Sequence, residues 1–307
     1  MSDHLPIQHT VAILVCTYRR PAMLAALLDS LAEQQCPGIA ASVYVIDNDG
    51  QQSAAEIVVS RQRNNYPLQL TYLHEPQQNI SLARNRGLDH AQADYIAFID
   101  DDEVAVPGWL QSLVETAQSG NADLVFGPVI PVYPANMPHW LISGGFYERP
   151  RHDSGTTMPL LEARTGNVLI ASRVLGTPPL RFDPALGLSG GEDYVFFREL
   201  FARGCKAVWA DEAEVREEVP QARADAGWLV KRSFRIGSVE ASLSQRDGLR
   251  ASARIVAKIA WVLGRSVPAM LLNPFRSRAE RLSVRRRTAI GLGLLYGLLR
   301  GPYREYK

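Results

Sequence analysis

The stretch YIAFIDDDE, residues 95–103, decides the fold, because an apolar run ends abruptly in four consecutive acids. A short run of β-branched and aromatic residues predicts a strand. One or two acids after it would fit a helix start or a solvated loop, where carboxylates are common. Four adjacent carboxylates repel one another and indicate a cation as their partner. A divalent metal that carries phosphates is the economical choice, since Mg²⁺ and Mn²⁺ typically take one or two carboxylates together with phosphate oxygens.

This strand belongs to a regular alternation of strands and helices in the first half of the chain. Apolar or alternating runs predict strands, and amphipathic runs between them predict helices. Such an alternation is typical of an α/β fold with a mostly parallel sheet and helices on both faces. The predicted strands are residues 11–16, 42–47, 68–74, 94–100 and 122–130, and the predicted helices are residues 19–35, 52–62, 81–92 and 107–119.

Polar clusters follow three of these strands. TYRR (17–20), with Thr17, Tyr18 and Arg19, comes after the first strand. DND (47–49), with Asp47 and Asp49, comes after the second, and the four acids come after the fourth. Asp and Asn are also common turn formers, so the second cluster alone is a weak signal. In an open parallel sheet, however, ligands bind outside the carboxyl ends of the strands. We therefore expect the three clusters to converge at one edge of the sheet.

The class of protein is limited by the length of the chain, its cysteine content and its first residues. The 307 residues can hold one large domain, or one domain with a smaller appendage. The cysteines are Cys16, Cys36 and Cys205, and their odd number and wide spacing fit a reducing cytoplasm better than a disulfide framework. Residues 1–10 lack a basic segment followed by an apolar one, so we expect no signal peptide and a cytoplasmic protein.

The last sixty residues are basic, although the net charge of the chain is only +1. Residues 246–307 hold 14 Lys and Arg against 3 Asp and Glu, whereas residues 1–245 hold 19 against 29. The apolar segments of this tail contain Lys258, Arg265 and Pro268 or are short, so they are poor bilayer spans. Its pattern predicts amphipathic helices that either lie on an anionic membrane surface or form a solvated cap on the rest of the protein.

The segment GLSGGED, residues 187–193, permits two interpretations. It matches the G-x-S-x-G nucleophile elbow of α/β-hydrolases at Gly187, Ser189 and Gly191, but that motif requires a later histidine. All six histidines precede Ser189, so the hydrolase order cannot be completed. The alternative is that the glycines leave room for a substrate while Glu192 or Asp193, at a helix start, serves as a base.

Together these motifs resemble family 2 glycosyltransferases with the GT-A fold. The resemblance rests on VAILVCTYRR (11–20), an acid after the second strand, NISLARNRG (79–87), FIDDDE (98–103) and GGED (190–193), and it covers roughly residues 10–240. Within that family, FYERPR (146–151) and TGNVLI (165–170) look like the bacterial succinoglycan-biosynthesis glucosyltransferases. The resemblance implies a GT-A domain over residues 1–240, with a nucleotide-sugar half at about 10–130 and an acceptor half at about 131–240. Residues 241–307 would then be a basic, amphipathic helical extension.

The resemblance also implies roles for individual residues. Asp102 would bind the metal, and Asp193 would be the catalytic base with Glu192 beside it. Arg84 would pair with a diphosphate, or it would balance the acids structurally. The nucleotide-sugar site would comprise Thr17, Tyr18, Arg19, Asp47, Asp49, Asn79, Arg84, Asp100 and Asp101. The acceptor site would comprise Trp140, Asn167, Gly190, Gly191, Arg232 and Arg235.

The chain departs from the family pattern at Arg216, where relatives often have a histidine. Arginine cannot coordinate a metal, but it can pair with a diphosphate.

The expected reaction is an inverting transfer of a hexose, glucose by preference, from a UDP-sugar with Mn²⁺ or Mg²⁺. The expected acceptor is a saccharide linked to a lipid diphosphate, and the expected location is the inner face of the plasma membrane through residues 246–307, with no nucleic acid as partner. Two alternatives remain from the residues. One is a nucleotidyltransferase, although no Gly-rich loop with a lysine follows the first strand. The other is a non-catalytic protein that binds nucleotide-sugars or saccharides.

Overall fold

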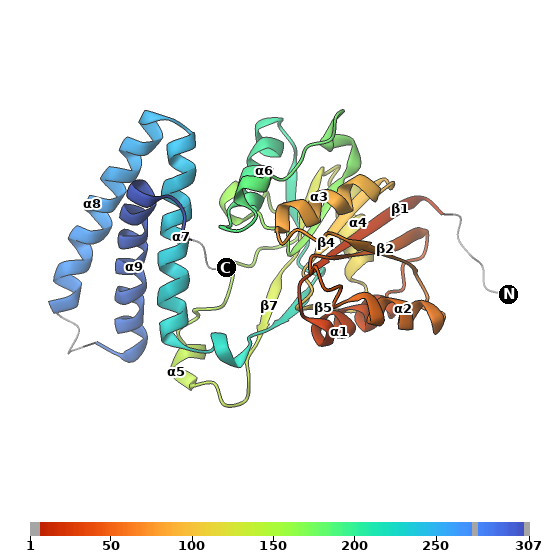
Figure 1. Ribbon diagram of the computed structural model, residues 1–307, viewed down its shortest axis with the longest axis horizontal. Helices are drawn as coiled ribbons and strands as arrows, with labels where there is room; N and C mark the ends of the chain where they lie inside the picture. Colours follow the sequence, from red (N-terminus) through yellow and green to blue (C-terminus); the bar gives the residue numbers. More distant parts are fainter. Residues whose placement is uncertain (1–6, 272–275, 304–307) are drawn as a thin grey trace. The chain divides into compact units, whose positions relative to one another are not determined.

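The structure is a computed structural model that describes residues 7–271 and 276–303 of the chain (Figure 1). It contains two compact units. The sheet unit comprises Met1–Pro131, Arg149–Gly187 and Glu192–Glu218, and the helical unit comprises Val132–Glu148, Leu188–Gly191 and Val219–Lys307. Each unit is described by itself.

A seven-stranded sheet forms the centre of the sheet unit. Its order is β3-β2-β1-β4-β8-β6-β9. All neighbouring pairs are parallel except those of β8, which runs antiparallel to both β4 and β6. The mostly parallel sheet is therefore confirmed. The strands are β1 (His9–Thr17), β2 (Ile39–Asp47), β3 (Gln69–His74), β4 (Tyr95–Ile99), β6 (Leu124–Phe126), β8 (Asn167–Ala171) and β9 (Ala207–Trp209).

Helices cover both faces of this sheet (Figure 1). Side chains alternate along β1, so Ile13 and Val15 join the core on one face and Leu14 joins the core on the other. Both faces of the sheet are buried, which explains why the sequences of the central strands are continuous apolar runs. One core contains side chains from α1 (Pro21–Ala32), α2 (Ala55–Arg63) and α4 (Trp109–Ser119), and the other contains side chains from α3 (Ile80–His90) and α6 (Glu192–Ala202).

The prediction of one strand over residues 122–130 is wrong, because the chain breaks after β6. Gly127 and Pro128 separate β6 from β7 (Val129–Val132), and proline has no amide proton for a strand ladder. A Cβ atom on Gly127 would lie 2.3 Å from the carbonyl oxygen of Ala213, so only glycine fits this close approach. A second sheet follows, which the sequence did not reveal; its order is β5 (Glu103–Ala105), β10 (Val215–Glu218), β7.

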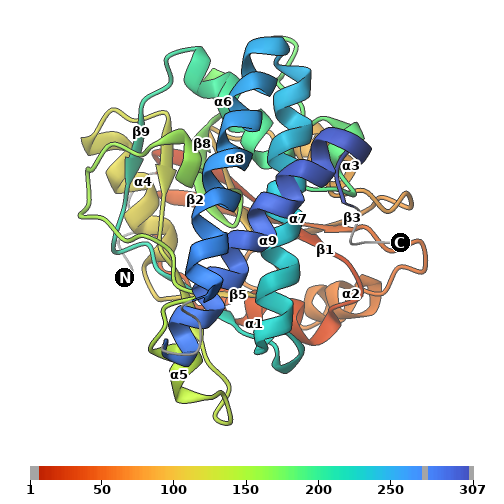
Figure 2. The same cartoon turned by 90° about the vertical axis from the view of Figure 1, so that its left-hand side faces the viewer.

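Three long helices dominate the helical unit and lie side by side (Figures 1 and 2). They are α7 (Ala226–Arg246), α8 (Leu249–Leu271) and α9 (Arg278–Arg300), and the short α5 (His139–Ile142) also belongs to this unit. The helical character predicted for the tail is confirmed. Helix α7 continues through residue 240, near which the sequence analysis placed the start of the extension.

Glycines bring α7 and α9 into backbone contact. A Cβ atom on Gly293 would lie 2.0 Å from the carbonyl oxygen of Phe234, and one on Gly297 would lie 2.3 Å from that of Ser238. On α7, a Cβ atom on Gly237 would lie 2.3 Å from the carbonyl oxygen of Ile290. The glycine-rich run in α9 therefore serves helix packing. Within the part of the chain that the structure describes, no helix has the length and apolar character needed to cross a membrane.

We expect Gly293→Ala to destabilise the helical unit, since its added methyl group would force α7 and α9 apart. Overpacking of this kind costs about 1–3 kcal/mol. Gly264→Ala on α8 is the matched control, because no atom lies within 4 Å of the added Cβ and an exposed helical alanine gains about 0.5–1 kcal/mol over glycine. Urea denaturation measures both free energies of unfolding. Equal stability of the two variants would contradict the backbone contact.

Candidate active site

The polar clusters after β1, β2 and β4 converge at one edge of the sheet, as predicted. Thr17 and Asp47 are register partners at the ends of β1 and β2. The Thr17 hydroxyl donates a hydrogen bond of 2.8 Å to Asp101, which follows β4. The Arg19 side chain donates one of 3.1 Å to Asp49, which follows β2. These contacts connect loops that lie 30 and 84 residues apart in the sequence.

The turn after β1 sends two adjacent arginines to different partners. Arg19 adopts φ 54°, a left-handed conformation that is uncommon outside glycine, and Pro21 begins α1 one residue after Arg20. Arg19 therefore faces Asp49, whereas Arg20 faces the acids after β4. The sequence analysis placed Arg20 in the polar cluster after the first strand but did not name it as a site residue. Because its neighbour carries the same side chain, only the backbone turn distinguishes them.

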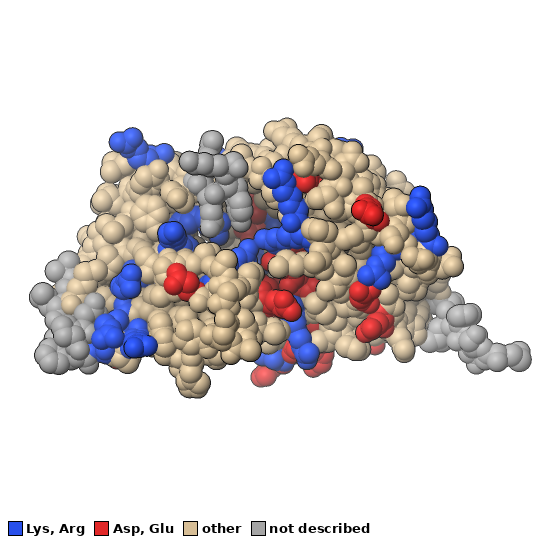
Figure 3. Space-filling view, turned by 60° about the horizontal axis from the view of Figure 1, so that its bottom comes forward, with Lys and Arg blue, Asp and Glu red and all other residues tan. Residues whose placement is uncertain are grey.

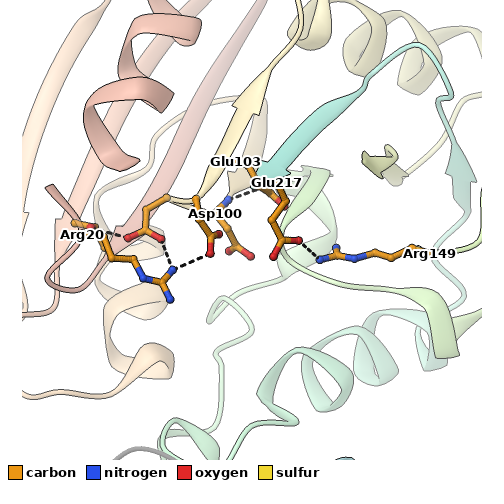
Figure 4. A network of polar contacts seen from close by, with 8 residues as sticks. Arg20, Asp100, Glu103, Arg149 and Glu217 are labelled. Carbon is orange, nitrogen blue, oxygen red and sulfur yellow. Dashed lines mark hydrogen bonds and ion pairs between the residues drawn. The ribbon is translucent and has the colours of Figure 1, made fainter. Parts of the chain in front are cut away.

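Arg20 binds two of the four acids through a single nitrogen (Figure 4). Its Nη1 lies 2.9 Å from Oδ1 of Asp101 and 2.9 Å from Oδ2 of Asp102. Thr17 satisfies the other oxygen of Asp101. Two carboxylates thus share one cationic side chain, whereas the acidic stretch predicted a divalent metal in this role; the metal remains a prediction.

Asp47 holds the loop that follows β2. It is fully buried, and it accepts hydrogen bonds from the amides of Asp49 and Ala54 and from the Tyr72 hydroxyl. Its neighbour Asn48 binds the carbonyl oxygens of residues 75 and 77, a role that the sequence did not signal. Both side chains shape the loop. The nucleotide-binding role of Asp47 remains a prediction.

Two predicted site residues, Asn79 and Asn167, use their amides within the protein. Asn79 caps α3 by accepting a hydrogen bond from Leu82, and it donates one to Pro184. Asn167 is 3% exposed; its oxygen accepts from Trp109, and its nitrogen donates to two carbonyl oxygens. These contacts give both residues structural roles. The acceptor-binding role of Asn167 remains a prediction.

Arg84 forms a buried ion pair with Glu192, the first residue of α6. Their side chains are each 9% exposed, and the nitrogen–oxygen distance is 2.6 Å. Burial raises the pKa of Glu192, and the Arg84 charge opposes this shift. Removing one partner of a buried pair typically costs about 3–5 kcal/mol. Of the two roles considered for Arg84, the structure shows the pairing with an acid; a diphosphate would have to compete with Glu192.

Asp193 lies beside this pair, but its environment differs. It is partly exposed in the first turn of α6, where the helix dipole favours a negative charge, and it accepts a hydrogen bond of 2.7 Å from the amide of Tyr194. Arg84 is within electrostatic reach of Glu192, Asp100 and Asp193. The acids at the start of α6 and at the end of β4 therefore interact with the same arginine, Arg84.

Glu103 is a buried member of the acidic group, and the partly exposed Asp100 lies beside it (Figure 4). Glu103 is 1% exposed, and it accepts a hydrogen bond of 2.9 Å from the Asp100 amide. Its register partner on β10 is Glu217, which Arg149 neutralises at 2.7 Å. Burial, together with the charge on Asp100, raises the pKa of Glu103 well above its ordinary value. Figure 3 shows Asp and Glu side chains gathered on one face of the protein, with Lys and Arg beside them.

Gly166 provides the space for these acids. A Cβ atom at this position would lie 2.8 Å from Oε1 of Glu103 and 3.1 Å from Oδ2 of Asp100. Oε1 of Glu103 is buried and has no hydrogen-bond partner. Glu103 is therefore part of the packing around these acids.

Arg216 is 60% exposed and binds Glu214 at 3.2 Å. Because side chains alternate along a strand, Arg216 and Glu217 project from opposite faces of β10. Glu217 is the residue of this segment that faces the acidic group, since its charge raises the pKa values of both Asp100 and Glu103.

The donor set at this edge fits a divalent cation that brings ligands of its own. In residues 7–271 and 276–303, no three His, Cys, Asp or Glu side chains converge as a metal-binding group. Asp101 and Asp102, however, present oxygens to one shared cationic nitrogen. Mg²⁺ and Mn²⁺ commonly take one or two carboxylates and complete their shell with phosphate oxygens and water. Asp102 would hold the ion, with Asp101 beside it as the second carboxylate.

The remaining acceptor candidates belong to the helical unit. Trp140 packs, partly buried, against a small core around Leu141 and Leu229. The guanidinium of Arg232 lies 5.3 Å from the centre of the Trp228 ring. Arg235 lies on the same helix, α7. Gly190 and Gly191 have φ values of 89° and 92°, which favour glycine, and a Cβ on Gly191 would contact Val239 at 2.8 Å.

Comparisons with known proteins agree with this architecture. Residues 12–165 match the sequence model of the family described as Glycosyl transferase family 2. The succinoglycan biosynthesis protein ExoM of Rhizobium meliloti is 38% identical over 294 residues, which cover 93% of this chain and 91% of that protein.

Two solved structures share the fold at low sequence identity. The mannosyltransferase PcManGT of Pyrobaculum calidifontis, solved with GDP-Man and Mn²⁺, has a TM-score of 0.63 at 16% identity, over 96% of this chain and 90% of that chain. Residues 1–349 of S. aureus TarS, solved with UDP-GlcNAc, have a TM-score of 0.56 at 16% identity, over 96% and 93%. The fold is therefore the GT-A fold.

The pKa of Asp100 gives a test of the site's electrostatics. Burial, opposed by Arg84 and reinforced by the neighbouring acids, raises this pKa to about 7. The folded protein then holds the proton more tightly than the unfolded chain, so stability falls as the pH rises from about 4 to about 7. We expect Asp100→Asn to remove this loss. The free energy of unfolding of the variant, relative to that of the wild type, should increase by roughly 2–3 kcal/mol between about pH 4.5 and pH 8. This value is reduced because Asp100 is partly exposed.

Urea denaturation in EDTA at several pH values measures this difference. Exposed Glu199→Gln on α6 is the control and should show a constant offset from the wild type. An Asp100→Asn advantage that does not change with pH would show that Asp100 titrates normally.

Proposed function

The chain belongs to glycosyl transferase family 2, and on this premise we propose that it moves a hexose from a UDP-sugar to a saccharide acceptor with inversion. The proposed donor sugar is glucose, and the proposed setting is bacterial exopolysaccharide assembly. The observation that carries the proposal is that Arg84 is in electrostatic reach of both Asp100, beside the acids held by Arg20, and Asp193 at the start of α6. Family membership also decides against a nucleotidyltransferase and against a non-catalytic binding protein.

Three similarities support the choice of substrates. ExoM is named for succinoglycan biosynthesis, TarS was solved with UDP-GlcNAc, and PcManGT was solved with GDP-Man and Mn²⁺. In this chain, the carboxylates of Asp101 and Asp102 would hold a divalent ion together with the donor diphosphate. When bound, such an ion offsets the negative charge that grows on the leaving diphosphate.

Asp193 is the proposed general base. Its carboxylate takes the proton from the acceptor hydroxyl while that oxygen attacks the anomeric carbon. The bond from this carbon to the diphosphate oxygen breaks, and its electron pair leaves with the UDP. Attack opposite the leaving group inverts the configuration. Asp193 suits this role better than Glu192, because Glu192 is buried against Arg84 and positions the start of α6.

We expect Asp193→Asn to bind UDP-glucose with nearly wild-type affinity and to lose about 10²–10⁴-fold in transfer rate, the usual contribution of a general base. Calorimetry with Mn²⁺ measures donor binding, and UDP release in the presence of a saccharide acceptor measures transfer. Glu199→Gln removes an exposed acid from the same helix and serves as the control. Transfer by Asp193→Asn at the wild-type rate would exclude Asp193 as the base.

The proposed acceptor is linked to a lipid diphosphate, and α8 is the proposed contact with the membrane. The solvent-exposed part of α8 includes Leu249, Val256 and Trp261, at 90%, 56% and 61%. Arg254 and Arg265 are also exposed, and Arg265 lies 5.3 Å from the centre of the Trp261 ring. Helix α8 contains no Asp or Glu. Exposed apolar residues that include a tryptophan, together with basic residues, are typical of helices that lie on anionic lipid.

We expect the double variant Val256→Gln, Trp261→Gln to bind vesicles of anionic phosphatidylglycerol at least about tenfold more weakly than the wild type, since it removes two exposed apolar side chains from α8. Vesicle flotation measures the bound fraction. Val59→Gln on α2 removes a side chain that is 38% exposed in the sheet unit, and it should float like the wild type. Equal flotation of all three proteins would contradict the role of α8.

A further inference from the structure

Arg20 occupies the solvent side of the carboxylate pair that is proposed to hold the metal. Its side chain is 34% exposed, whereas those of Asp101 and Asp102 are 6% and 9% exposed. A cation that arrives from solvent therefore meets the guanidinium before it meets the carboxylates. The ion would also need the Asp102 carboxylate, of which Arg20 holds one oxygen at 2.9 Å.

The backbone around Arg20 leaves only its side chain to move. Arg19 before it is fixed in a left-handed turn and tied to Asp49 at 3.1 Å. Pro21 after it starts α1, and its ring restricts the backbone further. The guanidinium can therefore leave the acids by side-chain rotation, while Thr17 keeps its bond to Asp101.

We propose that Arg20 is the internal cation of this carboxylate pair, and that it makes metal binding depend on the nucleotide. A divalent ion alone must displace the guanidinium and leave it without its two carboxylates. A nucleotide diphosphate supplies anionic oxygens to which a guanidinium binds well. The ion and the diphosphate together therefore compensate for the lost ion pairs, and neither does so alone.

This arrangement has a thermodynamic consequence. If UDP raises the affinity for Mn²⁺ through Arg20, then Mn²⁺ must raise the affinity for UDP by the same factor. Replacing Arg20 by an uncharged residue should weaken this coupling from both directions. The metal would then reach the carboxylates without competition, and the nucleotide would lose one of its cationic contacts.

The test measures Mn²⁺ binding by electron paramagnetic resonance, in which the signal of the free ion falls on binding, with and without UDP. For Arg20→Gln we expect about tenfold tighter Mn²⁺ binding without UDP and a coupling factor at least about fivefold smaller than in the wild type. Arg61→Gln is the control. Arg61 pairs with Asp29 on α1, so this variant also loses one positive charge, but at a position away from the acids. It should match the wild type in both quantities.

The inference rests on the proposed metal site, and the outcomes separate the two. Wild-type protein that binds no Mn²⁺ even with UDP would overturn the metal site, and the inference with it. Wild-type binding with unchanged or weaker Mn²⁺ affinity in Arg20→Gln would overturn the role of Arg20 alone.

Circular dichroism establishes whether Arg20→Gln is folded. If it is not, Arg20→Ala and Arg20→Lys replace it. Lysine keeps the charge and should bind Mn²⁺ without UDP as weakly as the wild type, whereas alanine should bind it more tightly. Equal affinities of these two variants would overturn the proposal.

Discussion

The site depends on the balance of charge between buried acids and the few arginines placed among them. The acids after β4 are largely buried at the end of a sheet whose two faces are covered by helices, and unpaired buried carboxylates are costly. Arg20 holds Asp101 and Asp102 from one side, and Arg84 is in electrostatic reach of Asp100 from another. Burial nevertheless raises the pKa values of Asp100, Asp101 and Glu103, and the arginine charges oppose these shifts.

This balance explains how the elements of the sheet unit fit together. The left-handed turn at Arg19 directs Arg20 to the acids, and the missing side chain of Gly166 leaves room for Glu103 and Asp100. Through Arg84, the same charge environment extends to Glu192 at the start of α6, beside Asp193. The helical unit has a different organisation, in which glycines of α7 and α9 meet at the backbone and α8 keeps exposed apolar side chains.

Much of the sheet could be predicted, because buried parallel strands and amphipathic helices have distinct periodicities. The convergence of Thr17, Asp49 and Asp101 followed from one topological rule about strand ends. The break between β6 and β7 and the second sheet could not be predicted, because they depend on the approach of the Ala213 carbonyl to Gly127 from a distant part of the chain. The contacts of Asn167 could not be predicted for a related reason: its partners are carbonyl oxygens and an indole from other elements.

The sequence by itself determined the fold class, the family resemblance and the edge of the sheet at which the acids gather, since these follow from local patterns and their order along the chain. Only the tertiary structure decided which charges pair. Arg19 and Arg20 are chemically identical neighbours, and a backbone turn gives one to Asp49 and the other to Asp101 and Asp102. Glu192 and Asp193 are adjacent acids, and burial against Arg84 separates the positioning residue from the proposed base. Ion pairing depends on the distance between side chains and on their burial, and the order of residues alone specifies neither.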